Sequence, residues 1–334
     1  MRAQHQIAEF FQGHFSLVCI TCLIGGMLFG ATPGAVLAPA VPWIMAVLMF
    51  SSGLGLRVRD LHSLREKPWL LPVILFLLHL VIPMIWVGLT MLLRFPIEAV
   101  MGFAILAILP ISASCMVWIG ANRANIALGM ALLLVDTLFA PFIIPYVLDF
   151  LFGANVHIDA IRMLWSLFWM LFFPTLLALV CNRLSHGKLQ QVAGKPLALA
   201  GKFAILIILF INGGVVSPFF TDCDITFVLV LGMTFGLTSL LFLVSFLLGR
   251  LLFTDKEDVI SFMLCAIRGT TTGMVIAMAY FPPLTTLTVA FNMLFQQPLG
   301  SWAGKKAMAY LEEKEQKAKT APALGAGTVT PPLA

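Results

Sequence analysis

ILPISASCMVW at residues 108–118 and AIRGTTTGMV at residues 266–275 are the two stretches that decide the fold of this chain. Each interrupts a long apolar run, the first with Pro110 and two serines, the second with an arginine, two glycines and three threonines. Both predict a helix that unwinds partway across a membrane, where the unwound backbone offers free hydrogen-bonding groups. Proline and glycine are common in membrane helices generally, so the matched pair carries more weight than either stretch alone.

The composition places these stretches in lipid. Of the 334 residues, 60% are apolar and only 10% are charged, whereas a soluble domain carries about a quarter charged residues. Apolar runs of roughly 20 residues recur, which is the length a helix needs to cross about 30 Å of hydrocarbon. Because lipid cannot satisfy backbone polar groups, these runs must be helical. We therefore expect an all-α membrane protein in contact with the lipid bilayer.

Ten transmembrane helices are predicted from the apolar runs. Their ranges are Phe15–Gly30, Ala35–Leu56, Pro68–Leu93, Ile97–Ala121, Asn125–Phe152, Ile161–Asn182, Leu197–Pro218, Ile225–Leu252, Val259–Tyr280 and Leu284–Ala307. Before them, residues 1–14 form a polar cytoplasmic segment. After them, residues 309–334 are charged, then rich in Ala, Pro and Gly, and are expected to be a disordered cytoplasmic tail.

Basic residues set the expected orientation. Seventeen of the 20 Lys and Arg residues fall on one side of this ten-helix arrangement, two (Arg94 and Arg162) fall on the other, and Arg268 lies inside a helix. The positive-inside rule then puts both termini in the cytoplasm of a bacterial cell, with the helices in its inner membrane. The net charge of +5 is explained by these short loops, so no nucleic-acid partner is expected.

The ten helices divide into two sets of five, residues 15–153 and 154–308. An odd number of helices per repeat inverts the second copy, and the interrupted helices are the fourth and ninth, one at the same place in each half. This arrangement predicts a substrate site at the bilayer midplane. The polar side chains that the interrupted helices and the tenth helix bring there are Arg268, Thr270, Thr271, Thr272, Ser112, Ser114, Gln296 and Gln297. The two Gln amides also suit bonding between helices.

Two charges lie in the middle of predicted helices. Asp136 and Arg268 would each cost about 2.5–3.5 kcal/mol on insertion scales, so such residues pair or face a cavity. We expect Asp136 to partner Arg268 when no substrate is present, with protonation of Asp136 as a route to coupling. A permanent structural pair is the alternative. His79 is the one histidine within a predicted helix, suited either to packing or to a proton relay.

Four segments carry a family resemblance: VPWIMAVLMFSSGLGLRVRDL (41–61), ILPISASCMVWIGANRANIALGMALLLVDTLFAPFIIP (108–145), FMLCAIRGTTTGMVIAMAYF (262–281) and NMLFQQPLGS (292–301). They resemble the bile acid:sodium symporter family. The resemblance spans nearly the whole chain, Phe15 to about Lys306. It implies a ten-helix fold of two inverted five-helix repeats, with a panel domain and a core domain that carries the broken fourth and ninth helices.

The resemblance fails at the sodium site. Family members with sodium sites have a Pro-Gly-Gly-x-x-Ser-Asn run in the fourth helix and a Glu-x-Gly-x-Gln-Asn run in the ninth. The positions that match the family's sodium ligands are here Leu78, Cys115, Met116, Gly129, Leu133, Ala266, Thr270 and Thr271. A hard cation needs oxygen ligands, anionic ones above all, and Arg268 has replaced the family's glycine. The chain is thus not expected to be a sodium symporter of the usual kind.

Transport of a small organic solute, an organic anion above all, is the favoured function, driven by protons, by exchange or by the gradient alone. A membrane-embedded enzyme is the first alternative, but an intramembrane aspartyl protease needs two mid-helix Asp residues and only Asp136 qualifies. A non-transporting sensor is the second, although no soluble output domain is attached. Arsenite efflux is a weaker option within transport, because arsenite-efflux relatives keep a cysteine directly after the fourth-helix proline and Cys115 lies five positions after Pro110. Neither a metal site nor a cofactor is expected.

Overall fold

The computed structural model describes residues 18, 21–30, 36–56, 69–154, 159–218 and 225–320. The predicted segment 1–14 and residues 321–334 of the predicted tail lie outside these ranges. The named elements are η1 (Ala38–Ala40), α3 (Val41–Gly53), α4 (Leu70–Phe76), η3 (Leu77–Val81), α5 (Ile82–Leu92), α6 (Ile97–Ile108), α7 (Cys115–Ala121), α8 (Ile126–Phe152), α9 (Ala160–Leu167), η4 (Phe168–Phe172), α10 (Phe173–Leu184), α11 (Lys188–Val216), α13 (Ile225–Leu252), α14 (Lys256–Leu264), α15 (Thr270–Tyr280) and α16 (Pro283–Thr320). A further helix covers residues 21–29.

The all-helical expectation is confirmed for the described residues, and each of the ten predicted ranges contains helix. Within the described part, four helices are long and apolar enough to cross a membrane: Pro72–Leu92, Ile126–Phe152, Ala160–Leu184 and Ile225–Leu252. A fifth candidate combines Lys188–Gly194 with Leu199–Val215, which meet at 58°. Pro196 lies at this bend, where its ring removes a backbone hydrogen bond. The chain is a multi-pass membrane protein by these spans.

Both predicted breaks are present. The first runs from the end of α6 at Ile108 to the start of α7 at Cys115, and the second from the end of α14 at Leu264 to the start of α15 at Thr270. The two unwound stretches lie side by side and antiparallel, paired between Ile111 and Arg268. We call the residues 109–114 and 265–269 the crossover.

Two single-turn π-helices, η3 and η4, lie at the middle of the third and sixth predicted helices. Each contains the residue four positions before a proline: His79 before Pro83, and Met170 before Pro174. Because a proline has no N–H and its ring clashes with the carbonyl four residues earlier, a wider turn accommodates it without ending the helix. The wide turn of η3 also determines where His79 projects.

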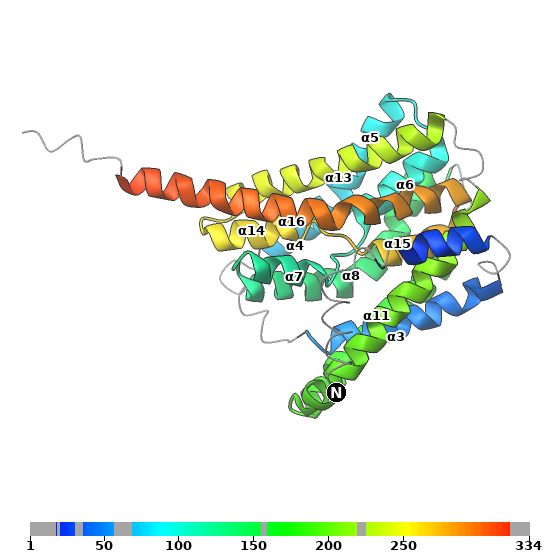
Figure 1. Cartoon of the computed structure of the whole chain (residues 1–334), viewed down its shortest axis with the longest axis horizontal. Coiled ribbons are helices and arrows are strands. Elements are labelled where there is room, and N and C mark those ends of the chain that lie inside the picture. Colours follow the sequence, from blue (N-terminus) through cyan, green and yellow to red (C-terminus); the bar gives the residue numbers. More distant parts are fainter. Residues whose placement is uncertain are drawn as a thin grey trace, which may run out of the picture.

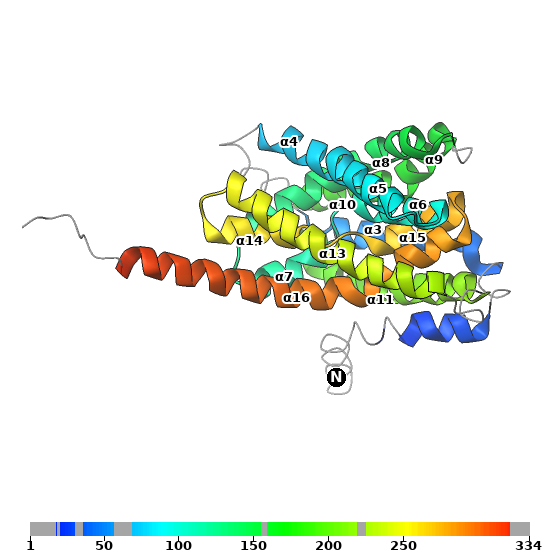
Figure 2. The same ribbon diagram turned by 90° about the horizontal axis from the view of Figure 1, so that it is seen from above.

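The helices pack in two groups that meet at the crossover. Helices α3 and α11 pack against each other and lie at an angle to the group formed by α6, α13, α14 and α16 (Figure 1). Within that second group α13 and α16 run alongside each other in both views (Figure 2). The helix over residues 21–29 lies against α11 through two glycines, because a Cβ on Gly26 would overlap the carbonyl oxygen of Phe210 and one on Gly213 that of Leu23.

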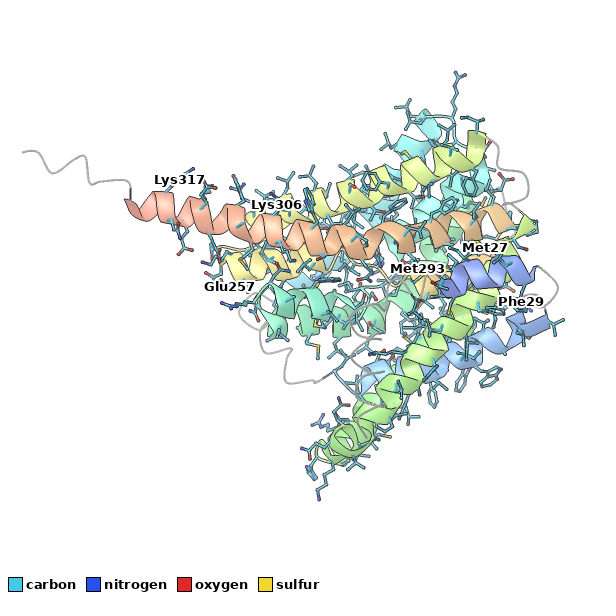
Figure 3. All side chains as sticks on the ribbon, viewed as in Figure 1. Met27, Phe29, Glu257, Met293, Lys306 and Lys317 are labelled. Carbon is cyan, nitrogen blue, oxygen red and sulfur yellow. The ribbon has the colours of Figure 1, made fainter. Side chains whose placement is uncertain are left out.

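The carboxy-terminal segment differs from the expectation. Helix α16 continues to Thr320, so residues 309–320 are helical rather than disordered. The added turns consist mainly of Ala, Glu, Lys and Gln, which are strong helix formers. Lys256 at the start of α14 pairs with Glu315 at 2.7 Å, and Lys317 pairs with Glu313 one turn earlier. Lys306, Lys317 and Glu257 lie at one end of the molecule, and Met27 and Phe29 at the other (Figure 3).

Candidate functional site

The crossover is held together by main-chain hydrogen bonds between its two strands. Ser112 N donates to Ile267 O and Gly269 N to Pro110 O, both at 2.8 Å. The amide of Gln296 on α16 forms a second clamp, accepting from Arg268 N and donating to Arg268 O, both at 2.9 Å. The unwound backbone is therefore fixed by partners from three segments rather than left free, as burial of polar groups requires.

A cavity of about 140 Å³ lies between the crossover and the helices α3, α10 and α11. Its polar wall comes from the crossover and the start of α15, with Ser112, Ser114, Thr271 and Thr272 in the lining. The opposite side is mainly apolar, with Met45, Leu48, Met49, Leu56, Leu171 and Ile205, and it also includes Ser52 of α3. Thr137 of α8 and Thr175 of α10 add two further hydroxyl-bearing residues to the lining. The cavity thus has one face suited to a polar group and one suited to a hydrocarbon body.

Ser114 is oriented by a chain of side-chain hydrogen bonds. Trp118 Nε1 donates to Gln297 Oε1 at 2.7 Å, and Gln297 Nε2 donates to Ser114 Oγ at 3.0 Å. Ser114 Oγ lies 3.0 Å from Ser112 Oγ. Gln297, predicted to contact the solute, is absent from the cavity lining and instead positions the two serines that line it.

Arg268 projects to the other side of the crossover from this cavity. Its side chain is buried, and Nη1 donates to Leu109 O at 3.2 Å. It lines a separate small cavity together with Thr238, Asn292 and Gln296. The amide of Asn292 donates to Thr270 Oγ1 and to Gln296 Oε1, both at 2.9 Å, and Asn292 Oδ1 accepts from Thr238 Oγ1 at 2.7 Å. Arg268, Thr270 and Gln296 thus form an interior network behind the solute cavity.

The expected contact between Asp136 and Arg268 is wrong for this structure. No ion pair joins them, and Asp136 Oδ1 instead lies 2.6 Å from His79 Nε2. The other carboxylate oxygen accepts from Ile111 N at 2.5 Å. His79 projects from the wide turn of η3 toward α8, and its side chain takes the position beside Asp136 that the guanidinium was expected to occupy. Arg268 and Asp136 contact the first strand of the crossover two residues apart, Arg268 at Leu109 O and Asp136 at Ile111 N, and they attract each other without direct contact.

The His79 ring spans the first break. Its Nδ1 lies 2.9 Å from Ile108 O, the last carbonyl of α6. A carbonyl oxygen can only accept, so Nδ1 carries a hydrogen. The short contact between Nε2 and Asp136 then requires one more proton, either on the imidazole or on the carboxyl group. By this assignment of hydrogens, His79 and Asp136 share a proton and together carry no net charge.

The predicted site residues fall into three places. Ser112, Ser114, Thr271 and Thr272 meet at the large cavity, whereas Arg268, Thr270 and Gln296 meet behind the crossover, and Asp136 and His79 clamp its first strand. The sequence interpretation missed Asn292, Thr238 and Trp118. Asn292 lies four residues before Gln296, hence on the same helix face, and that spacing was the available signal.

The positions that match the family's sodium ligands carry few oxygens near the crossover. Cys115, Leu133 and Ala266 are buried, and the thiol of Cys115 contacts that of Cys265. Within the described residues, no group of three His, Cys, Asp or Glu side chains is placed to hold a metal ion. Asp136 is the one buried carboxylate in the described part, and it is engaged by His79 and Ile111.

Comparison with known proteins agrees with this architecture. The model of the SBF-like CPA transporter family matches residues 12–298. The uncharacterized protein YbaS of Bacillus subtilis (strain 168) is 26% identical over 267 residues, covering 79% of this chain and 87% of the relative. The uncharacterized sodium-dependent transporter YocS of the same organism is 22% identical over 278 residues, covering 83% of this chain and 85% of the relative. The chain therefore belongs to the SBF-like CPA transporter family, which confirms the resemblance to bile acid:sodium symporters.

Proposed function

We propose that this membrane transporter carries a small organic anion, which binds in the cavity beside the crossover. The observation that carries the proposal is that one wall of this cavity is rich in hydroxyl groups while the opposite wall is mainly apolar. A solute with one polar group and a hydrocarbon body satisfies both walls at once. The cavity is close in size to one of about 150 Å³ that accommodates benzene, so a steroid-sized solute would need a wider conformation.

The polar wall favours negative charge. Helix α15 begins at Thr270, and its next two residues, Thr271 and Thr272, line the cavity, so the positive end of the helix dipole lies at the polar wall. Arg268 adds a full positive charge just behind the same strand. A carboxylate or similar group at the hydroxyls would be attracted by both. Membership of a transporter family favours carriage of this solute over its chemical conversion.

Sodium is not the coupling ion in this proposal. A sodium ion needs several oxygen ligands. Of the positions that match the family's sodium ligands, only Thr270 and Thr271 have a side-chain oxygen, and the others include Cys115, Gly129, Leu133 and Ala266. The relative YocS is named a sodium-dependent transporter and is 22% identical to this chain, but the chain lacks the carboxylate and amide ligands that such a site would need. Arg268 supplies a fixed positive charge at the position that the family resemblance matches to a glycine.

A proton is the better candidate for coupling. The pair formed by Asp136 and His79 holds one proton and contacts both ends of the first break, at Ile108 O and Ile111 N. The other ionisable groups near Asp136 are Arg268 and the adjoining thiols of Cys115 and Cys265. Loss of the shared proton would leave the pair negative and break one of its contacts, which would release the first strand of the crossover.

The arrangement of the chain in the membrane follows the same proposal. Residues 15–153 and 154–308 form two inverted five-helix repeats, with α3 and α11 in the panel and the crossing helices in the core. Both termini face the cytoplasm from the inner membrane. The lysine-rich end of α16 and the breaks at matching places in the two halves support this assignment.

Thermal unfolding of the purified protein tests the site. The probes are benzoate, phenylacetate, isovalerate and succinate, with cholate as a steroid carboxylate. We expect at least one of the small carboxylates to stabilise the protein and cholate to do so less. Ala113 lines the cavity, so Ala113→Phe should abolish the effect, whereas Ala121→Phe at the exposed end of α7 should retain it. Equal stabilisation of both variants would place the ligand elsewhere.

A further inference from the structure

The small cavity behind the crossover contains a positive charge without a counter-charge. Arg268 is buried, and only Nη1 of its guanidinium has a partner, the carbonyl oxygen of Leu109. Nε and Nη2 are buried and bond to nothing in the described part of the chain. A buried cation left this way is unfavourable unless something compensates its charge and its hydrogen-bonding groups.

No described side chain provides the compensation. The nearest carboxylate, Asp136, is committed to His79 and Ile111 N. Because that pair shares a proton, it is neutral as a whole and does not balance the guanidinium. A small species in the cavity is the remaining way to satisfy Arg268.

The size of the cavity limits the species. Its volume is about 10 Å³, and its walls are Arg268, Thr238, Asn292 and Gln296 with apolar neighbours that include Trp86 and Leu106. Such a volume just holds one water molecule, so a monatomic anion, which is somewhat larger, requires the apolar neighbours to move outward slightly. An organic carboxylate is too large, and the crossover strands separate this cavity from the larger one.

The hydrogen-bonding groups in the wall favour an acceptor. Gln296 Oε1 already accepts from Arg268 N and from Asn292 Nδ2, and Asn292 Oδ1 already accepts from Thr238. The free groups are chiefly donors: Arg268 Nε–H and Nη2–H, and the second N–H of Gln296, which uses its first on Arg268 O. A water molecule could donate to the second lone pair of Asn292 Oδ1, but it would leave the charge of the guanidinium unbalanced, whereas a halide balances that charge.

From charge, volume and donors together, we propose that Arg268 binds a single inorganic anion in this cavity, with chloride as the occupant in the cell. The anion neutralises the guanidinium and accepts from Nε and Nη2. A bound anion would offset the attraction that Arg268 exerts on the solute in the large cavity, and the helix dipole of α15 would then carry that attraction alone.

The test compares thermal unfolding of the purified protein in sodium chloride, sodium bromide and sodium gluconate at equal ionic strength. We expect chloride and bromide to raise the melting temperature with saturation, and gluconate, which is too large, to leave it low. Arg268→Gln should abolish the difference. Arg162→Gln, the same change on the exposed α9 surface, should leave it intact.

Because Arg268→Gln could fail to fold, a second variant and a direct probe of the bound anion are also needed. Ala266 lines the small cavity, so Ala266→Val should reduce the halide effect while the charge remains. In crystals grown with bromide, an anomalous peak should lie within hydrogen-bonding distance of Nε and Nη2. Equal melting temperatures in chloride and gluconate for the wild-type protein would overturn the proposal, as would a halide effect that survives in Arg268→Gln.

Discussion

His79 and Asp136 form a buried hydrogen-bonded pair, with 2.6 Å between Nε2 and Oδ1. Through this pair, the third and fifth predicted helices hold the break in the fourth helix in place. The other nitrogen of His79 contacts the last carbonyl of α6, and the other oxygen of Asp136 accepts from Ile111 N. Four polar groups are thereby satisfied at a place where the helix supplies no partners of its own.

Removing one member of this pair should be costly. His79→Leu leaves the carboxyl group of Asp136 buried beside an apolar side chain, and loss of one partner of a buried pair costs about 3–5 kcal/mol. The double variant His79→Leu with Asp136→Asn removes the charge and should recover part of that loss. Thermal and denaturant unfolding of the wild-type protein, the single variants His79→Leu and Asp136→Asn, and the double variant measures the coupling. Additive effects of the two substitutions would show that the pair has no energetic role.

The link from Trp118 through Gln297 to Ser114 predicts an effect on binding without contact to the solute. Gln297→Leu removes both hydrogen bonds and lets the serines turn, so affinity for a stabilising carboxylate should fall by about tenfold, near 1.4 kcal/mol. Gln191→Leu on the exposed face of α11 is the matched control. Calorimetric titration of both variants measures the difference in affinity. Unchanged affinity in Gln297→Leu would show that the orientation of Ser112 and Ser114 does not matter for binding.

Close packing of the helix over residues 21–29 on α11 predicts a sharp difference between two glycines. At Gly213 a Cβ would overlap the carbonyl oxygen of Leu23, so Gly213→Ala must separate the helices and should cost roughly 1–3 kcal/mol. At Gly232 on α13 nothing lies within 4 Å, and Gly232→Ala should be neutral or slightly stabilising. Melting temperatures of the two variants provide the check. Equal values would mean that the two backbones are not in contact.

The distribution of basic residues predicts topology. Reporter fusions placed after Thr320 and after Asp222 should report opposite sides of the membrane, with Thr320 in the cytoplasm, because the lysine-rich end of α16 carries most of the local positive charge. If a cytoplasmic reporter were active at both positions, the number of membrane spans between them would be even, and the predicted arrangement would be wrong.

Much of the fold could be predicted because the governing signals are local. Apolar length sets each span, and Pro110 with the Gly269–Gly273 stretch marks both breaks. The helical extension to Thr320 was missed because a charged, lysine-rich composition is shared by solvated helices and disordered tails. Ion pairs such as the one from Lys256 to Glu315 depend on which helices are neighbours, and no spacing along the chain contains that information.

The site was predicted less well for the same reason. Residue type and depth identified Asp136, His79 and Arg268, but the partner of Asp136 depends on the direction in which each side chain leaves its helix. The π-turn at η3 rotates His79 toward α8, and a regular helix would not place it there. Arg268 leaves an unwound strand, whose side-chain direction cannot be inferred from helical periodicity.

Uptake of a labelled carboxylate into proteoliposomes tests the central claim, that this chain moves an organic anion through the crossover cavity with a proton and without sodium. The carboxylate is the one that most stabilises the purified protein, and potassium is the only alkali cation. The account predicts uptake driven by a pH gradient, unchanged when sodium replaces potassium and lost in Asp136→Asn. Uptake that requires sodium and is indifferent to the pH gradient would contradict it.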